Sequence, residues 1–461
     1  MKGHYIIDPG MMPINDIYKD LVDFSKSQDL ILLTERRRQS QFKIFEKNIP
    51  ILFYENFQAP SKTKLHKDFH FLYQKALLSV LEDNRTFLLA ERVNRISPLN
   101  SVFNQIPIME QIVYNMVLLH QEKPIHAIIF QATPHNLPNW IMAKVAEVIG
   151  IKVQMIQTSP LPWRYWIVEG LDVQKNIFPK NIVVSEIDKS YIQDYVELNR
   201  RNYSEALPDY EKKRLEKGKG KFWSWRREFT SGVKNKKAFL SLPYKKKIYD
   251  LYQTLTIEPN KGDKYLVFFL HFQPERTSMP EAFEFSNQWL IIRMISNSLP
   301  TGWKLYVKEH PSMFTNYFDI RYRNKSFYNN IAELDNTQLL SLESDTFDLI
   351  DNAQGVVTIT GTVGVQALVR GKPVFTFGVS SYRGLKNVYV IRKTEDLNLA
   401  FEAIKEPYQT FSNNEFIEVA QQSISGVDLE NEYGISPYDS KIRSNGHIRL
   451  LKEYLLNERA N

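Results

Sequence analysis

Residues 355–378 read GVVTITGTVGVQALVRGKPVFTFG and predict a strand, a glycine turn, a helix and a second strand. The run 355–360 is short, apolar and rich in β-branched side chains, which is typical of a strand buried in a parallel sheet. Gly361 permits a sharp turn, and the hydroxyl of Thr362 is suited to cap a helix over 363–370. The stretch therefore predicts one complete βαβ unit.

The start of that helix is a possible anion site. A helix that begins beside the carboxyl end of a strand presents free N–H groups and the positive end of its dipole. Phosphate and carboxylate groups bind at such positions. The segment alone is equally consistent with an ordinary βαβ connection that binds nothing.

The composition indicates a globular protein of two domains. The 461 residues exceed one ordinary core, and 43% of them are hydrophobic. The chain has no cysteine, which excludes disulfides and thiolate metal sites. Neither a signal peptide nor an apolar run of about 18–20 residues is present, so we expect a cytoplasmic protein.

The positive charge of the chain is concentrated in one segment. Residues 211–247 contain 14 Lys and Arg against three Glu, so the rest is mildly acidic although the total is +7. The segment also carries aromatic residues, among them Trp223 and Trp225. It is either a solvated linker or a surface that docks on an anionic membrane. Nucleic acid is not an expected partner, because no recognition motif accompanies the charge.

Strands and helices alternate on both sides of this segment, which predicts parallel sheets covered by helices. The predicted strands are 30–34, 49–54, 86–90, 127–130, 152–156, 265–270, 304–308, 331–334, 355–360, 374–377 and 388–391. The predicted helices are 69–81, 102–120, 139–149, 281–296, 345–352, 363–370, 395–405, 414–423 and 440–457. The pattern predicts an α/β, GT-B-like fold of two Rossmann-like domains facing a cleft, with a helical basic linker.

The predicted domain boundaries follow these changes of character. Residues 1–186 are predicted to form an N-terminal Rossmann-like domain, and 187–260 the basic helical linker. A C-terminal Rossmann-like domain is predicted over 261–440, and 441–461 are predicted to form a terminal helix.

Three strand ends of the second half carry polar residues that we expect to converge. The first is 270–277, LHFQPERT; the second is 308–311, KEHP; the third is 360–366, TGTVGVQ. A histidine can donate a hydrogen bond to a phosphate oxygen, and hydroxyl and backbone N–H groups complete an anion cradle. The candidate donor-binding residues are His271, Gln273, Glu275, Lys308, His310, Pro311, Thr360, Gly361, Thr362 and Gln366.

The motifs FFLHFQPERTSMP, LYVKEHP and VVTITGTVGVQALVRGKPVFTFG, in this order over 265–383, resemble bacterial capsule and surface-polysaccharide biosynthesis proteins, in particular Kdo-transferase-like glycosyltransferases. The resemblance implies a GT-B fold, a nucleotide-activated sugar donor in the second domain, a glycan or glycolipid acceptor in the first, and work at the inner membrane face. It also implies that His310, Thr360 and Thr362 hold the phosphate of a CMP-sugar. Gln366 departs from the pattern, in which a glutamate is commoner, and this puts the donor's identity in question.

The base that removes the acceptor's proton is harder to assign. His135 follows the predicted strand 127–130, where a loop of the first domain would face the cleft; a helix-capping role is the alternative. Glu91 and Glu169 are rival carboxylates after apolar runs. The sequence does not distinguish an inverting from a retaining transfer.

A metal requirement is not predicted, because the chain has no Asp-x-Asp triplet and no zinc-type spacing of ligands. We expect no cofactor, with the nucleotide-sugar as substrate. The predicted function is a metal-independent glycosyltransferase of capsule or surface-polysaccharide synthesis, with a CMP-sugar as the favoured donor. The alternatives are a nucleotide-sugar epimerase, a polyol-phosphate transferase on the same fold, and a non-catalytic scaffold of capsule assembly.

Overall fold

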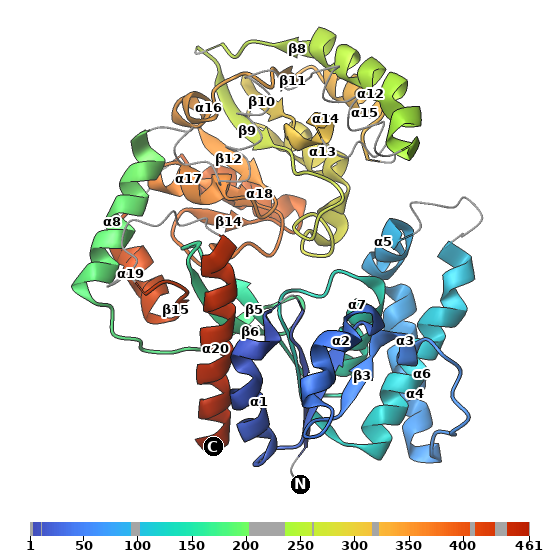
Figure 1. Ribbon diagram of the computed structural model, residues 1–461. Helices are drawn as coiled ribbons and strands as arrows, with labels where there is room; N and C mark the ends of the chain where they lie inside the picture. Colours follow the sequence, from blue (N-terminus) through green and yellow to red (C-terminus); the bar gives the residue numbers. More distant parts are fainter. Residues whose placement is uncertain are drawn as a thin grey trace. The chain divides into compact units, whose positions relative to one another are not determined.

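The computed structural model describes residues 3–10, 12–93, 102–201, 236–260, 262–315, 322–405, 411–428 and 440–460. The chain divides into two compact units: unit 1 comprises Met1–Lys189 and Phe416–Asn461, and unit 2 comprises Ser190–Glu415. Each unit is built on its own mainly parallel sheet (Figure 1). The predicted α/β class with two parallel-sheet domains is therefore confirmed.

The sheet of unit 1 has the strand order β15-β6-β5-β4-β1-β2-β3, with β7 paired to β6. The strands are β1 (His4–Asp8), β2 (Leu30–Thr34), β3 (Ile51–Phe53), β4 (Ile125–Phe130), β5 (Lys152–Thr158), β6 (Arg164–Glu169), β7 (Lys175–Phe178) and β15 (Ile424–Ser425). The five strands from β3 to β5 are parallel, whereas β6 runs antiparallel to β5. The order reverses between β1 and β4, so a crevice opens there at the carboxyl ends.

Helices pack on the sheet of unit 1 in two groups. The helices concerned are α1 (Tyr18–Ser25), α2 (Gln39–Phe42), α3 (Tyr54–Phe57), α4 (Lys67–Glu82), α5 (Asn84–Val93), α6 (Ile106–Glu122), α7 (Leu137–Val148) and α20 (Ser440–Ala460). Helices α4, α5 and α6 pack around α7, while α1 packs against α20 (Figure 1). The Tyr5 hydroxyl of β1 donates to the Glu458 carboxylate at 2.7 Å, so the end of the chain is anchored on the first strand.

The C-terminal part of the chain thus returns to the first unit. The predicted division assigned 261–440 to the second domain and made 441–461 a separate helix. In the structure, Phe416–Asn461 belong to unit 1. Helix α8 (Glu186–Arg201) begins in unit 1 and ends in unit 2, and α19 (Asn413–Gln421) spans the return.

The sheet of unit 2 is parallel throughout, in the order β14-β13-β12-β9-β10-β11-β8. The strands are β8 (Thr256–Ile257), β9 (Lys264–Phe269), β10 (Trp303–Lys308), β11 (Thr337–Leu340), β12 (Gly355–Thr358), β13 (Val374–Thr376) and β14 (Val388–Val390). This order reverses between β9 and β12, as it does between β1 and β4 in unit 1. Both units therefore place a crevice beside their first central strand.

Alternate residues of the unit 2 strands face two cores. Leu266 and Phe268 of β9 belong to a cluster with side chains of four helices, α12 (Lys236–Leu255), α13 (Gln288–Ser298), α15 (Lys325–Ala332) and α18 (Thr394–Ala403). Tyr265 points to the other face, where its hydroxyl donates to the Leu349 carbonyl of α16 (Thr346–Asn352). Burial on both faces explains why these strands are almost continuously apolar.

Three predicted elements are wrong. Residues 86–90 lie in the helix α5, because Thr86, Leu89 and Ala90 are buried at helical spacing. Residues 331–332 end α15 and residues 333–334 belong to the turn after it, and the strand of this region is β11. The helix expected over 281–296 begins only at Gln288, after a 3-10 turn at Phe283–Ser286.

The larger part of the basic segment 211–247, including Trp223 and Trp225, lies outside the described residues. Its last part belongs to α12.

Candidate functional site

Unit 2 contains a cavity of about 240 Å³, here called the β9 cavity, at the carboxyl ends of β9, β10 and β12. It lies where the strand order reverses, the usual ligand position in such sheets. Nine of the ten candidate donor-binding residues line it: His271, Glu275, Lys308, His310, Pro311, Thr360, Gly361, Thr362 and Gln366. The three strand ends singled out in the sequence therefore meet at one cavity.

His271 is fixed in the floor of the β9 cavity as a neutral imidazole. Its Nε2 lies 3.1 Å from the Ile359 backbone N–H and 3.0 Å from the Thr358 hydroxyl. Because a backbone N–H can only donate, Nε2 is the acceptor and the ring proton resides on Nδ1. Burial, with a smaller contribution from Arg323, lowers the pKa of His271 to about 4. The imidazole therefore holds the end of β12 in place and carries no charge at neutral pH.

The glycines of the turn after β12 are required by close packing. A Cβ on Gly361 would lie 2.9 Å from the Thr358 hydroxyl and 3.3 Å from His271 Nε2. A Cβ on Gly364 would lie 2.4 Å from the ring of Tyr382, whose hydroxyl donates to the Gly361 carbonyl at 2.7 Å. The side chains of His271 and Tyr382 thus clamp the turn from two sides.

Helix α17 (Val363–Val369) starts at this turn, as predicted. Thr362 precedes it, but its hydroxyl makes no capping hydrogen bond. The prediction that Thr362 caps the helix is therefore wrong. Its exposed side chain lies instead at the rim of the β9 cavity, while Thr360 donates weakly to the Thr277 carbonyl at 3.4 Å.

His310 follows β10 and also lines the cavity as a neutral imidazole. Its Nδ1 accepts the Ser312 backbone N–H at 3.1 Å, which leaves the ring proton on Nε2. Lys308, two residues earlier, is buried, and its ammonium donates to the Ser344 carbonyl at 2.6 Å and to the Thr346 hydroxyl at 3.1 Å. The cavity therefore contains an imidazole donor and a buried cation.

A buried ion pair lies beneath these loops. Arg323 pairs with Glu309, and both side chains are almost fully buried. Glu309 also accepts the Tyr328 hydroxyl and the His310 backbone N–H, each at 2.7 Å. A buried ion pair is favourable only when its remaining hydrogen-bonding groups also have partners. Here the partners of the pair connect the loop of His271 with the loop of His310.

Gln273 is the one candidate donor-binding residue that the structure places away from the cavity. Its Nε2 donates to the Ser286 carbonyl at 2.6 Å, and its Oε1 accepts from Arg323 at 3.0 Å. Its amide is therefore satisfied within the loop after β9.

Gln366, by contrast, faces the cavity from the second turn of α17. The residue is only 4% exposed, and its amide can both donate and accept hydrogen bonds at the wall of the cavity.

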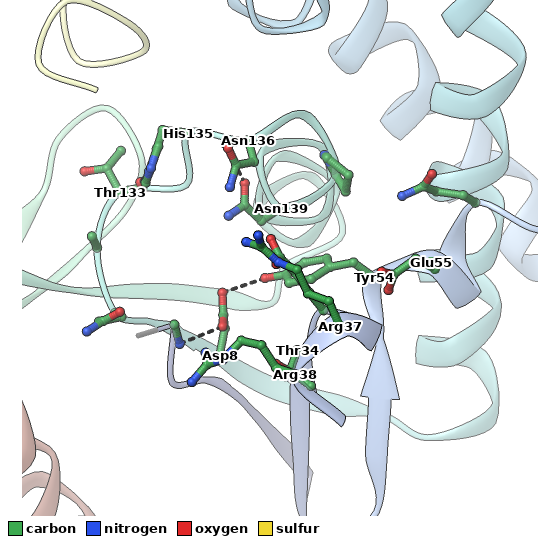
Figure 2. A pocket seen from close by; sticks show the side chains of 16 residues that line it. Asp8, Thr34, Arg37, Arg38, Tyr54, Glu55, Thr133, His135, Asn136 and Asn139 are labelled. Carbon is green, nitrogen blue, oxygen red and sulfur yellow. Dashed lines mark hydrogen bonds and ion pairs between the residues drawn. The ribbon is translucent and has the colours of Figure 1, made fainter. Parts of the chain in front are cut away.

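Unit 1 contains a larger cavity, of about 490 Å³, at the equivalent place; we call it the β1 cavity. Four of the five parallel strands, β1 to β4, contribute residues at or after their carboxyl ends: Asp8, Thr34, Tyr54 and His135 are examples. The volume falls within the range of roughly 300–1,000 Å³ typical of small-molecule sites. Figure 2 shows these side chains around the cavity.

Asp8 ends the central strand and extends toward the first turn of α7 (Figure 2). Its two carboxylate oxygens accept the Gly10 backbone N–H at 2.9 Å and the Tyr54 hydroxyl at 2.6 Å. The Asn139 side chain lines the same cavity. Burial raises the pKa of Asp8, against the opposing effects of these hydrogen bonds and of Arg38.

The charged groups after β2 and β3 are partly neutralised among themselves. Arg37 pairs with Glu35, and the Glu55 carboxylate accepts the Arg36 backbone N–H at 3.1 Å. Arg38 donates to Gln41 at 3.1 Å and interacts electrostatically with Asp8.

Of the three candidate bases, the structure brings only His135 to the β1 cavity. Its Nδ1 donates to the Thr133 carbonyl at 2.9 Å, which makes Nε2 the acceptor nitrogen. Glu91 is exposed on α5. Glu169 ends β6, which is antiparallel, and pairs with Gln154 at the amino end of β5, so it lies at the opposite edge of the sheet.

Sequence reasoning missed Asp8, Tyr54 and Arg323. Asp8 follows the apolar run 5–7 and precedes Pro9 and Gly10, which is the same pattern of strand, polar residue and turn that identified Thr360 and Gly361. Tyr54 and Arg323 carry no comparable local signal, since their partners lie 46 and 14 residues away.

Within the described ranges, no group of three or more histidine, aspartate or glutamate side chains could hold a metal ion. None of the described helices is long and apolar enough to cross a membrane.

Residues 192–386 match the family model described as capsule polysaccharide biosynthesis protein. This match confirms the resemblance that the motifs of 265–383 predicted. A search of curated proteins returns no match.

Solved structures with a similar arrangement include a beta Kdo 2,7 transferase, KpsC of Thermosulfurimonas dismutans. It is 12% identical with a TM-score of 0.31, over 72% of this chain and 88% of that one. Another is the UDP-GlcNAc 2-epimerase of Neisseria meningitidis, 12% identical with a TM-score of 0.28, over 99% of this chain and 100% of that one. Likenesses at this level do not bear on substrate.

Proposed function

We propose that the protein is a glycosyltransferase of capsule or surface-polysaccharide synthesis that binds the phosphate of a nucleotide-activated sugar in the β9 cavity. The observation that carries the proposal is the convergence of His310, Lys308 and the turn at 360–362 on one cavity of the segment that matches the capsule family. A CMP-sugar is the favoured donor, as the resemblance of the motifs implies.

The chemistry of the β9 cavity suits a leaving phosphate. As the bond between the anomeric carbon and the phosphate oxygen breaks, negative charge grows on the nucleotide. The Nε2–H of His310 and the ammonium of Lys308 are donors suited to stabilise that charge. The hydroxyls of Thr360 and Thr362 add donors without adding charge.

Other lining residues suit the sugar and ribose hydroxyls. Gln366 offers an amide that both donates and accepts, and Glu275 offers a carboxylate that accepts. Pro311 and the main chain of Gly361 shape the walls. His271 would act indirectly, by holding the backbone at Ile359 and Thr360.

A thermal-shift panel of CMP, UDP, GDP and CDP tests the proposal. We expect one nucleotide to raise the melting temperature in a concentration-dependent manner, because a ligand that binds only the folded state stabilises it. If none of the four does so at millimolar concentration, the protein is no sugar-nucleotide enzyme, and a scaffold of capsule assembly is the better account.

The nearest enzymatic alternative is a nucleotide-sugar epimerase, with a polyol-phosphate transferase as another. An epimerase converts its sugar nucleotide without an acceptor. Incubation with the donor alone should therefore leave the donor unchanged, and a new isomer in the product would contradict a transferase.

The acceptor would be a glycan or glycolipid. The basic segment 211–247 would keep the enzyme at an anionic membrane face, where such acceptors are made.

A further inference from the structure

We propose that Arg323 is a positioning residue of the donor site, whose buried guanidinium holds the loops after β9 and β10 in the geometry that binds the nucleotide phosphate. The inference rests on the proposed function. It assigns a role in phosphate binding to a residue that lies outside the lining of the β9 cavity. The network around this guanidinium lies entirely within unit 2.

All five N–H groups of the Arg323 guanidinium are used within the protein. Nε donates to one carboxylate oxygen of Glu309, and Nη2 donates to the other at 3.3 Å. Nη1 donates to Gln273 Oε1 at 3.0 Å and to the Tyr322 carbonyl at 3.1 Å. Nη2 also donates to the His271 carbonyl at 3.3 Å. Because a guanidinium has five donors, none is left for a ligand, and the side chain acts through the loops that it joins.

These contacts reach the three strand ends that form the β9 cavity. Gln273 and the His271 carbonyl belong to the loop after β9. Glu309 belongs to the loop after β10, where its carboxylate accepts the His310 backbone N–H at 2.7 Å. The imidazole of His271 in turn accepts the Ile359 N–H at 3.1 Å, at the end of β12. One guanidinium therefore fixes the relative positions of the loops that carry the proposed phosphate donors.

The network is anchored on the helix α15. Arg323 directly precedes Asn324, whose side chain caps this helix by accepting the Phe327 N–H at 2.9 Å. The guanidinium carbon lies 4.4 Å from the centroid of the Phe327 ring, a cation–π contact. Tyr328 of the same helix donates its hydroxyl to Glu309 at 2.7 Å. The loops are thus held against a rigid element of the core.

Stability alone does not account for a charge pair at this place. Arg323 and Glu309 are each 1% exposed, so both have lost their hydration. A buried ion pair is often no more stable than apolar side chains of similar volume, because desolvation offsets the attraction. A guanidinium adds a planar fork of donors with fixed directions, which neither lysine nor an apolar side chain reproduces. The pair is therefore suited to fix a geometry.

Calorimetric titrations of the full-length protein test the inference. The ligands are the nucleotide that emerges from the panel of CMP, UDP, GDP and CDP, and the corresponding nucleoside. The dissociation constant of the nucleoside divided by that of the nucleotide measures the contribution of the phosphate to binding. A general loss of packing in unit 2 would weaken both ligands and leave this ratio unchanged.

The double variant Glu309→Gln/Arg323→Met removes both charges together, so no unpaired charge stays buried. Its melting temperature should remain near that of the wild type. The ratio should fall about 10-fold or more, because displaced donors lose their hydrogen bonds to the charged phosphate. The dissociation constant of the nucleoside should stay near the wild-type value.

Asp263→Asn/Lys304→Met is the matched control. Lys304 donates to Asp263 at 2.8 Å, and this pair lies at the amino ends of β9 and β10, at the opposite edge of the same sheet. The control variant also removes an ion pair from unit 2. Both of its dissociation constants should equal those of the wild type.

Gln273→Met tests one arm of the guanidinium and leaves the ion pair intact. Gln273 is suited to this test because the other contact of Arg323 in the same loop, the His271 carbonyl, also accepts the Gln288 amide at 3.0 Å. The variant should lower the ratio in the same direction by a smaller factor. It decides the question if the double variant does not fold.

The outcomes separate the two proposals. If the ratio of the deciding variant equals that of the wild type, whether or not both ligands bind more weakly, Arg323 only supports the fold of unit 2. The inference is then overturned, and the proposed function stands. If the wild type binds none of the four nucleotides, or binds nucleotide and nucleoside equally, the proposed function fails and the inference falls with it.

Discussion

At the residue scale, Asp8 is the last residue of β1 and His271 follows β9 by two residues, and each of these strands borders the reversal of strand order in its sheet. Burial acts on both and favours the neutral form, so it raises the pKa of Asp8 and lowers that of His271. The consequences differ. A carboxylate with a raised pKa is a better proton acceptor, whereas an imidazole that stays neutral is a permanent acceptor for the Ile359 N–H.

The neutral state of His271 predicts a pH dependence of folding. The unfolded chain takes up a proton near pH 6.5, whereas the folded protein does so only near pH 4. The stability that depends on neutral His271 is therefore fully present above pH 6.5 and is lost as the pH falls toward 4. The loss amounts to about 3 kcal/mol, at 1.4 kcal/mol for each unit of pKa shift.

Urea unfolding at pH 7 and pH 4 measures this effect. His271→Gln, whose amide oxygen can accept the Ile359 N–H, should lose less stability over this interval than the wild type. An identical pH dependence of both proteins would show that His271 is not held neutral.

At the scale of elements, the turn between β12 and α17 is the part that builds the β9 cavity. Gly364→Ala should place a Cβ against the ring of Tyr382 and lower the free energy of unfolding by about 1–3 kcal/mol. Nucleotide affinity should fall as well, because Tyr382 also anchors the Gly361 carbonyl.

Gly384→Ala is the control, since no atom lies within 4 Å of the position of its Cβ. It should leave both unfolding and nucleotide affinity near the wild-type values. Equal behaviour of the two variants would contradict the clamp formed by Tyr382.

The elements also show what sequence can and cannot predict. The strands β9, β10, β12 and β13 were predictable because both of their faces are buried, which makes them largely apolar, whereas β11 at Thr337–Leu340 was missed. The run 86–90 is equally apolar but helical, and only its burial against α7 distinguishes the two. The first strand was missed because His4 and Asp8 flank just three apolar residues.

The residues of the candidate site were likewise predictable from the sequence only in part. Residues of the β9 cavity come from three contiguous motifs, so their order along the chain identified them. The contacts of Tyr54 with Asp8 and of Arg323 with Gln273 join separate loops, and neither the residue types nor their spacing in the sequence predicts these contacts.

At the scale of the whole molecule, the basic segment 211–247 predicts binding to membranes. The five substitutions Lys212→Gln, Lys213→Gln, Arg214→Gln, Arg226→Gln and Arg227→Gln should release the protein from vesicles containing anionic lipid. Each charge near such a surface contributes about 1 kcal/mol, so a loss of more than 100-fold in binding is expected.

Vesicle co-sedimentation measures this release, with vesicles of neutral lipid as the control. Substitution of five cationic residues dispersed outside the segment, Lys19, Lys43, Lys62, Lys67 and Lys405, should reduce binding far less. If the two variants bind anionic vesicles equally, the segment is a solvated linker.

The central claim is that the β9 cavity holds a nucleotide phosphate, and calorimetric titration of the nucleotide that emerges from the panel tests it most directly. His310→Ala should raise the dissociation constant of the nucleotide by about 10–100-fold, since a hydrogen bond to a charged group contributes about 1.5–3 kcal/mol. His66→Ala, which removes an exposed histidine of unit 1, should leave the constant unchanged. Equal affinity of wild type and His310→Ala, with both proteins folded, would contradict the account.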